Sequence, residues 1–187
     1  MVARGDIGRA VNILKRGGVI AFPTETTYGL GCDPRNKKAV QRLYKIKGRS
    51  TEKKFPLVAS SRSQVLKMTC MNATEQKLAK KHWPGPLTLI LSLGSGREYV
   101  AIRVSSYPLV RKLTRALGYP IIATSANRSG EPPCMSGQAV ASLFAGKKNA
   151  PDLILDGGKL PSSKPSTVAR INERGTIEVL RNGAIKL

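Results

Sequence analysis

Three segments of this sequence combine small hydroxyl, amide or carboxylate side chains with glycine. They are residues 23–33, 125–130 and 157–167. Glycine lets a backbone approach a ligand closely, while Ser, Thr and Asn supply hydrogen-bonding groups. Each segment follows a predicted strand, and ligands of α/β proteins tend to bind at strand ends. The three segments are therefore candidates for a binding site, although each of them alone is also typical of a turn.

A predicted helix, capped by Asn36 and ending near Lys47, carries the next candidate. Val40, Leu43 and Tyr44 form an apolar stripe at the spacing i, i+3, i+4. Position i+7 of the same stripe is Lys47. A lysine that continues a buried face is unusual on a surface helix, so the helical period singles out this cation.

The neighbouring lysine differs in phase. Lys45 falls about 140° from Val40 around the helix and is expected to face outward. Lys47 is followed by Gly48 and Arg49, so that two cations could point at one anion. The alternative is a cation that only interacts with the dipole at the helix C-terminus.

Several familiar catalytic and metal-binding arrangements are missing. His82 is the single histidine, and no G-x-S-x-G turn is present. Cys32, Cys70 and Cys134 are far apart and contain no C-x-x-C pair, which argues against a disulfide framework and a structural zinc site. No Walker motif and no G-x-G-x-x-G opening a helix occurs. A nucleotide would therefore have to be held by scattered loops and basic side chains.

The charge balance is strongly basic. The 187 residues include 32 Lys and Arg against 11 Asp and Glu, which gives a net charge of +21. Such a field attracts polyanions, including nucleic acid, nucleotide phosphates and anionic lipid. A solvated surface without a partner is the alternative, because charge alone names none. Residues 35–54 hold nine of these cations and one acid, Glu52.

The elements that must position these residues alternate between helix and strand. No apolar run is long enough for a membrane span or a signal-peptide core, so we expect a cytoplasmic protein. The length fits a single domain of residues 1–187. The later strands lack crossover helices, so the fold class is α/β with one twisted, mixed parallel and antiparallel sheet flanked by helices. The pattern predicts helices at 6–16, 36–47, 63–68, 74–82, 108–118 and 137–144, and strands at 19–22, 57–59, 87–93, 100–104, 121–124, 153–155, 167–171 and 176–180.

Taken together, the motifs resemble the YrdC-like family, in its short form, over nearly the whole chain. Seven elements occur in the order of that family. They are Pro23-Thr24-Glu25-Thr26 with Tyr28-Gly29-Leu30-Gly31, Lys47-Gly48-Arg49, Trp83-Pro84-Gly85-Pro86-Leu87-Thr88, Ala101-Ile102-Arg103-Val104, Ser125-Ala126-Asn127 with Ser129-Gly130, Ser166-Thr167-Val168, and Arg181-Asn182-Gly183. Many members carry a threonine-binding histidine where Ala59 and Ser60 stand here, so no such ligand is carried over.

The resemblance implies a ligand cavity and a nucleotidyltransferase reaction. L-threonine, bicarbonate or CO2, and ATP would give threonylcarbamoyl-AMP and pyrophosphate. Mg²⁺ is expected with ATP; no clustered carboxylates stand ready to hold it, so phosphate oxygens and water would supply its ligands. A partner complex would then pass the threonylcarbamoyl group to a tRNA adenosine beside the anticodon, and tRNA itself could lie on the basic residues 35–54.

The resemblance also implies roles for individual residues. Lys47 and Arg49 are the expected catalytic cations on the triphosphate. Arg103 would hold the threonine carboxylate with its guanidinium fork. The remaining ATP contacts would be Ser125, Asn127 and Arg181, and the remaining residues lining the threonine site would be Thr24, Tyr28 and Ser166.

Two other functions stay open at this stage. One is a non-catalytic protein that binds double-stranded RNA or ribosomes through its charge, which steep salt dependence without ATP turnover would reveal. The other is a YrdC-like relative that transfers a carbamoyl group elsewhere, from which threonine dependence separates the synthase.

Overall fold

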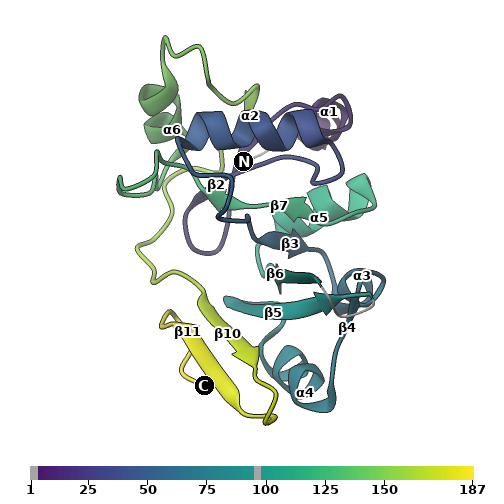
Figure 1. Ribbon diagram of the computed structural model, residues 1–187. Helices are drawn as coiled ribbons and strands as arrows, with labels where there is room; N and C mark the ends of the chain where they lie inside the picture. Colours follow the sequence, from purple (N-terminus) through teal and green to yellow (C-terminus); the bar gives the residue numbers. More distant parts are fainter. Residues whose placement is uncertain (1–3, 95–97) are drawn as a thin grey trace.

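The computed structural model describes residues 4–94 and 98–187 and contains two mixed β-sheets with helices around them (Figure 1). The helices are α1 (Arg4–Lys15), α2 (Lys37–Lys47), α3 (Arg62–Leu66), α4 (Ala73–His82), α5 (Pro108–Leu117) and α6 (Gly137–Phe144). The strands are β1 (Ile20–Pro23), β2 (Tyr28–Gly31), β3 (Leu57–Ala59), β4 (Thr69–Cys70), β5 (Leu87–Leu93), β6 (Glu98–Val104), β7 (Ile121–Ile122), β8 (Thr124–Ser125), β9 (Leu153–Ile154), β10 (Thr167–Ile171) and β11 (Ile177–Arg181).

The larger sheet has the strand order β11-β10-β5-β6-β3-β7, with β4 paired to β5. Strand β10 lies parallel to β5, and β3 lies parallel to β6, whereas the other pairs are antiparallel. The predicted mixed α/β class is therefore confirmed. The chain divides its strands between two sheets, however, where the sequence suggested one.

The smaller sheet has the order β8-β2-β1-β9 and contains a strand that the sequence did not predict. Residues 23–33 were expected to be a loop, but Tyr28–Gly31 pairs with β1 along its whole length. The strand was not predicted because it contains two glycines. Glycine is unfavourable in a regular strand and often marks a position where another backbone approaches closely. At Gly31 a Cβ would overlap the carbonyl of Ile122, which shows how closely the two sheets meet.

The segment from Ile121 to Ser125 joins the two sheets. Its first part, β7, pairs with β3 of the larger sheet, and its second part, β8, pairs with β2 of the smaller sheet. The sequence predicted one strand at 121–124. The observed strand changes sheets at Ala123, which donates its N–H to the carbonyl of Pro56 instead.

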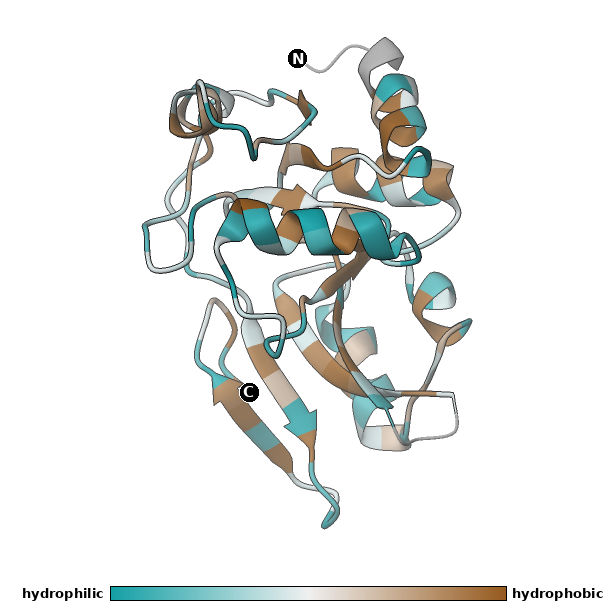
Figure 2. Cartoon of the chain, turned by 45° about the horizontal axis from the view of Figure 1, so that its top comes forward, coloured by the Kyte–Doolittle hydropathy of each residue, from teal (hydrophilic) through white to brown (hydrophobic). Residues whose placement is uncertain are grey.

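Apolar side chains fill the space between the layers. One core cluster includes residues of both sheets together with Leu43 and Ile46 of α2, and a second lies between β1, α1 and α5. Figure 2 shows strands that are mostly hydrophobic and helices on which hydrophobic and hydrophilic residues alternate. None of the helices in the described ranges is long and apolar enough to cross a bilayer.

Candidate active site

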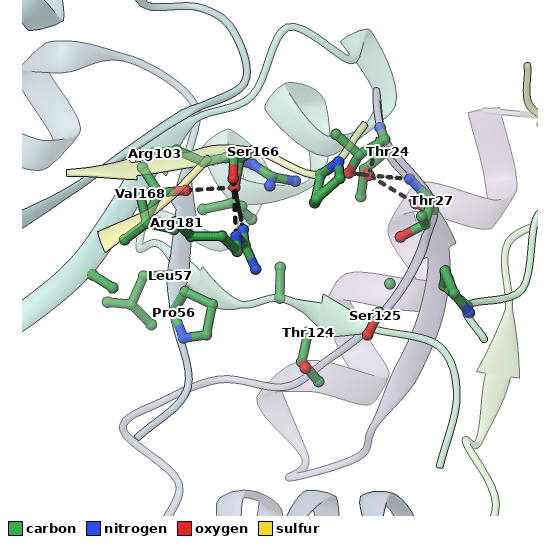
Figure 3. Close-up of a pocket in the computed structure, with 18 of the residues that line it drawn as sticks. Thr24, Thr27, Pro56, Leu57, Arg103, Thr124, Ser125, Ser166, Val168 and Arg181 are labelled. Atoms are coloured by element: carbon green, nitrogen blue, oxygen red, sulfur yellow. Dashed lines mark hydrogen bonds between the residues drawn. The ribbon is translucent and has the colours of Figure 1, made fainter. Parts of the chain in front are cut away.

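A cavity of about 400 Å³ opens between the two sheets (Figure 3). Strands β3, β5, β6, β10 and β11 of the larger sheet form one wall, and β2, β8 and the turn after β1 form the other. Six of the nine predicted site residues line it, although they come from six separate parts of the chain. These are Thr24, Arg49, Arg103, Ser125, Ser166 and Arg181.

Three guanidinium groups dominate the electrostatics of the cavity. Arg49, Arg103 and Arg181 all line it, and no Asp or Glu is among its described lining residues. Burial, followed by the nearby charge of Arg103, lowers the pKa of Arg181 below its usual value. Such a concentration of one sign suits a ligand with several negative charges, because low-dielectric walls strengthen the attraction.

Arg181 is held against the strand beside it. Its Nε and one terminal nitrogen donate to the carbonyl of Ser166 at 3.1 and 2.8 Å, and that nitrogen also contacts Ser166 Oγ at 2.9 Å. The Ser166 hydroxyl in turn lies 2.9 Å from Thr88 Oγ1. Both hydroxyls are buried. Thr88 lines the cavity too, and it ends the Trp83–Thr88 motif, so the sequence did hold a signal for it.

Arg103 is oriented by an acid from the opposite wall. Its Nε lies 3.1 Å from Glu25 Oε1, and both side chains are nearly buried. The second oxygen of Glu25 accepts a hydrogen bond from Ser105 Oγ. Arg103 Nε and Glu25 Oε1 lie at ion-pair distance without the geometry of a hydrogen bond, so Glu25 places a negative charge beside one edge of the guanidinium and leaves its terminal N–H groups for a ligand. The sequence did not assign a role to Glu25 or Ser105, because the contact joins residues far apart in the chain.

The helix that carries the predicted cations follows its sequence signals closely. Asn36 caps α2 by accepting from the N–H of Ala39 at 3.1 Å, and Gly48 ends it with φ of 58°. Lys47 is 2% exposed, whereas Lys45 is exposed, so the predicted difference in phase is confirmed. The buried stripe is shifted slightly from prediction, being formed by Ala39, Leu43, Ile46 and Lys47.

Lys47 lies behind the cavity wall and is not one of its lining residues. Its Nζ donates to the carbonyl of Ser125 at 2.7 Å and to Asn127 Oδ1 at 2.6 Å. Ser125 Oγ also donates to Asn127 Oδ1, at 2.6 Å. Asn127 is likewise buried behind the wall. The structure thus brings together Lys47, Ser125 and Asn127 as one network, with only Ser125 facing the cavity.

Burial lowers the pKa of Lys47 to about 8, and the nearby charge of Arg49 acts in the same direction. An ammonium has three N–H groups, of which two are already used. Arg49 itself donates from Nε to the carbonyl of Lys53 at 3.1 Å, and its guanidinium lies 5.3 Å from the ring centre of Phe55. Its other N–H groups remain for the cavity.

Two of the residues predicted for the threonine site, Thr24 and Tyr28, differ in whether they reach the cavity. The hydroxyl of Thr24 organises the turn after β1, donating to the carbonyl of Thr27 at 2.7 Å and accepting from the N–H groups of Thr26 and Thr27. Tyr28, in contrast, is fully buried and does not line the cavity. Its hydroxyl lies 2.8 Å from Asp156 Oδ1 and accepts from the N–H of Gly157.

Tyr28 therefore ties the 156–158 segment to the smaller sheet. Burial, above all, raises the pKa of its phenol to about 12. The third predicted segment, residues 157–167, reaches the cavity only near its end, through Pro165 and Ser166. Within the described residues no cluster of three or more His, Cys, Asp or Glu is positioned to hold a metal ion.

Comparison with known families gives a match over most of the chain. The model of the Sua5/YciO/YrdC family, described as "Telomere recombination", matches residues 12–183. A Vibrio parahaemolyticus protein named threonylcarbamoyl-AMP synthase is 39% identical over 186 residues, covering 94% of this chain and 97% of its own.

Two solved structures share the architecture. Sua5 of P. abyssi, crystallised with L-threonine, is 34% identical with a TM-score of 0.88, over 98% of this chain and 55% of that one. This chain thus spans about half the length of that Sua5. E. coli YciO is 30% identical with a TM-score of 0.84, over 97% of this chain and 90% of its own.

Proposed function

This chain belongs to the Sua5/YciO/YrdC family, and on that basis we propose that it acts as a threonylcarbamoyl-AMP synthase. It would join L-threonine, bicarbonate or CO2, and ATP into threonylcarbamoyl-AMP and release pyrophosphate, which makes it a nucleotidyltransferase. The observation that carries the proposal is one cavity lined by Arg49, Arg103 and Arg181, in a chain that is 39% identical to a protein of that name.

The chemistry requires two steps. The threonine amine adds to CO2 to form a carbamate, and a carbamate oxygen then attacks the α-phosphorus of ATP. A new P–O bond forms as the bond to the β-phosphate breaks, and the electron pair leaves with pyrophosphate. Because negative charge builds on the leaving group, fixed cations and correct positioning can supply most of the catalysis.

We assign the cations as the motifs of the family imply. Arg103 on β6 would hold the threonine carboxylate, with Glu25 fixing its orientation at 3.1 Å. Arg49 and Arg181 would contact the triphosphate. Ser125, which lines the cavity, has its hydroxyl proton on Asn127 Oδ1 and would accept a hydrogen bond from a ribose hydroxyl, and Thr24 and Ser166 would line the threonine site.

Lys47 and Asn127 would act from behind the wall. With two N–H groups on Ser125 and Asn127 and no surface in the cavity, the Lys47 ammonium would hold the backbone of Ser125 in place instead of contacting a phosphate directly. Its charge would also strengthen the field at the triphosphate. We assign no direct ligand role to Tyr28, whose buried hydroxyl is engaged with the 156–158 segment.

Mg²⁺ would enter with ATP. Mg²⁺ keeps several waters and commonly binds substrate phosphates. The described residues around the cavity offer oxygen donors but no acidic cluster, so phosphate and water oxygens fit as the principal ligands. When bound, the ion would neutralise part of the phosphate charge.

The product suggests the partners. A threonylcarbamoyl adenylate is a labile mixed anhydride with an activated carbamoyl group, so a transfer complex and a tRNA acceptor should take that group up. We place this activity in the cytoplasm and treat residues 1–187 as one domain, which the core cluster shared by both sheets supports.

Pyrophosphate release measured with each substrate omitted in turn tests the function. We expect release that needs ATP, L-threonine and bicarbonate together. Release that continues without threonine would refute the synthase and point to a carbamoyl-transferring relative. RNA binding with no ATP turnover at all would point to a binding protein.

A further inference from the structure

A second hollow, outside the cavity, is lined by an unusual share of the protein's aromatic residues. It has a volume of about 310 Å³ and lies among α2, the loop before β3, β6 and the end of α5. Four of the nine aromatic residues of the chain line it, namely Tyr44, Phe55, Tyr99 and Tyr119. We call this hollow, with those four residues, the aromatic groove.

Three of these four rings reach the surface, whereas Phe55 is buried. Tyr99 is 59% exposed, and Tyr44 and Tyr119 are half-buried. Tyr44 and Phe55 pack with ring centres 4.4 Å apart, which holds the floor in place. Tyrosine is enriched at binding surfaces because its ring is apolar and its hydroxyl polar.

The charged residues of the groove have one sign. Among its described lining residues only Arg35 and Lys54 are charged, and both are exposed. The Arg35 guanidinium lies 4.7 Å from the ring centre of Tyr119 and is paired on its other edge with Asp33, at 2.7 Å. The basic residues of α2 continue from this rim.

Flat aromatic faces beside cations are the features that bind unpaired nucleotides. Bases stack on aromatic rings while cations contact the backbone phosphates. Duplex RNA offers its bases only edge-on and would gain little from tyrosine faces. An apolar peptide could fill the same volume, but it would gain nothing from an all-cationic rim on a chain of net charge +21.

The groove also adjoins the cavity. Leu57 lines both, and the Phe55 ring in the groove packs under the guanidinium of Arg49, which lines the cavity. A nucleotide in the groove would therefore lie one side chain away from the proposed adenylate site.

We propose that the aromatic groove binds an unpaired base of single-stranded RNA, stacked on Tyr99 and on the plane of the Arg35 guanidinium that lies over Tyr119, with Lys54 on a flanking phosphate. The inference deepens the proposed function, since it places an unpaired segment of the RNA acceptor next to the activated product.

Binding of a fluorescent single-stranded RNA oligonucleotide tests the groove. Tyr119→Leu and Tyr99→Leu retain apolar bulk but lose the flat ring, and each should weaken binding roughly 5- to 150-fold. Tyr119→Phe should bind like the unaltered protein. The exposed apolar control Ile177→Ala, on β11, should change nothing.

Salt dependence separates stacking from phosphate contact. The tyrosine variants should leave the slope of log K against log salt unchanged, whereas Lys54→Ala should reduce its magnitude by about 0.7. Lys80→Ala, exposed on α4, is the matched charge control. The proposal would be overturned if the leucine variants bound single-stranded RNA as tightly as the unaltered protein does. It would also be overturned if these variants lost as much affinity for duplex RNA as for single-stranded RNA.

RNA binding by the aromatic groove and the synthase activity can be refuted independently of each other. Pyrophosphate release by Tyr99→Leu and Tyr119→Leu should equal that of the unaltered protein, because neither residue lines the cavity. Loss of RNA binding with synthesis intact supports the groove. Intact RNA binding in the leucine variants refutes the groove while leaving the synthase standing. Absent synthesis in the unaltered protein refutes the synthase, and the binding data still decide on the groove.

Discussion

At the scale of single residues, two lysines of one helix behave differently because of the helical period alone. Lys47 is buried against Ser125 and Asn127, whereas Lys45 faces solvent. This difference could be read from the sequence, since positions i and i+7 share a face. The ion pair of Arg103 and Glu25 could not, because it joins residues brought together only by the fold.

We expect Lys47→Ala to lower kcat/KM, because a buried charge near the triphosphate is removed. The decrease should correspond to a loss of about 2–4 kcal/mol of transition-state stabilisation. Lys45→Ala should cost under about 0.5 kcal/mol of stability and leave the rate nearly unchanged. Steady-state pyrophosphate release, with circular dichroism to verify folding, measures both. Equal losses in the two folded variants would contradict the assignment.

The same residue predicts a pH dependence. The pKa of Lys47 is lowered to about 8 by burial, so the ammonium is lost as pH rises through that value and pyrophosphate release should decline there. Stability should change in the opposite direction. Between pH 8 and the ordinary lysine pKa of 10.5 the unfolded chain binds more protons, so the free energy of unfolding contributed by Lys47 rises with pH.

Lys47→Arg separates this group from its neighbours. Arginine stays protonated, so any activity that remains should lack the decline near pH 8. The neighbouring Cys134 thiol has its pKa raised above its ordinary value, chiefly by burial, and so does not account for a decline there. A decline preserved in Lys47→Arg would show that another group titrates.

At the scale of elements, the C-terminal strand and tail position Arg181. The register of β11 against β10 shifts by a bulge between Val168 and Ala169, which sets Arg181 opposite Val168. Bulges re-aim side chains next to functional sites. The tail then returns along the strand, where Ala184 donates its N–H to the carbonyl of Pro165 at 2.9 Å.

Gly183 permits that return. A Cβ there would overlap the backbone of Pro165, Ser166 and Thr167, none of which is a flexible side-chain end. We expect Gly183→Ala to lower the melting temperature by several degrees and to raise the KM for ATP, because the strand that supports Arg181 must shift.

Gly8→Ala is the matched control. Gly8 lies in α1 with nothing within 4 Å of the added methyl group, so alanine should stabilise the helix by about 0.4–1 kcal/mol. Thermal unfolding and ATP titration of both variants check the pair. If Gly183→Ala left the melting temperature and the KM for ATP unchanged, the tail would not be held against β10.

The elements show where sequence reasoning succeeded. All six helices in the described residues carry an apolar face or a cap that marks their ends, as Asn36 and Gly48 do for α2. Strand β2 was missed because its Tyr28-Gly29-Leu30-Gly31 composition suits a loop, and only pairing with β1 makes it a strand. The assignment of Tyr28 to the cavity had the same cause, since a loop residue would have been free to face the ligand.

At the scale of the whole molecule, the basic residues 35–54 are not all available to a polyanion. Arg35 pairs with Asp33 and Arg42 with Asp152, and Lys47 is buried. Lys38 and Lys45 remain exposed on one face of α2. Charge reversal at both should reduce the salt slope of tRNA binding by roughly 0.7–0.9 for each phosphate that the protein then fails to neutralise.

Adenylate formation should stay nearly unchanged in that double variant, since neither lysine lines the cavity. Reversal of Lys77 and Lys80, both exposed on α4, is the charge-matched control. Filter binding of tRNA over a series of salt concentrations measures the slopes. Slopes that respond equally to both pairs would mean that only the net charge of +21 matters.

The strand that changes sheets at Ala123 constrains how substrates can enter. Because Ile121–Ile122 and Thr124–Ser125 belong to consecutive ladders, one stretch of backbone joins the two walls of the cavity. Opening the sheets at this edge would break the hydrogen bond that the Ile122 N–H donates to the carbonyl of Cys32, just after β2, and would separate Gly31 from the carbonyl of Ile122. The cavity residues Thr24, Thr26, Thr27, Pro165 and Ser166 lie in two connecting segments outside the strands, and we expect ATP, threonine and the finished adenylate to pass beside these segments. The rates of substrate entry and product release should therefore follow the motion of these two segments, while the sheets stay fixed.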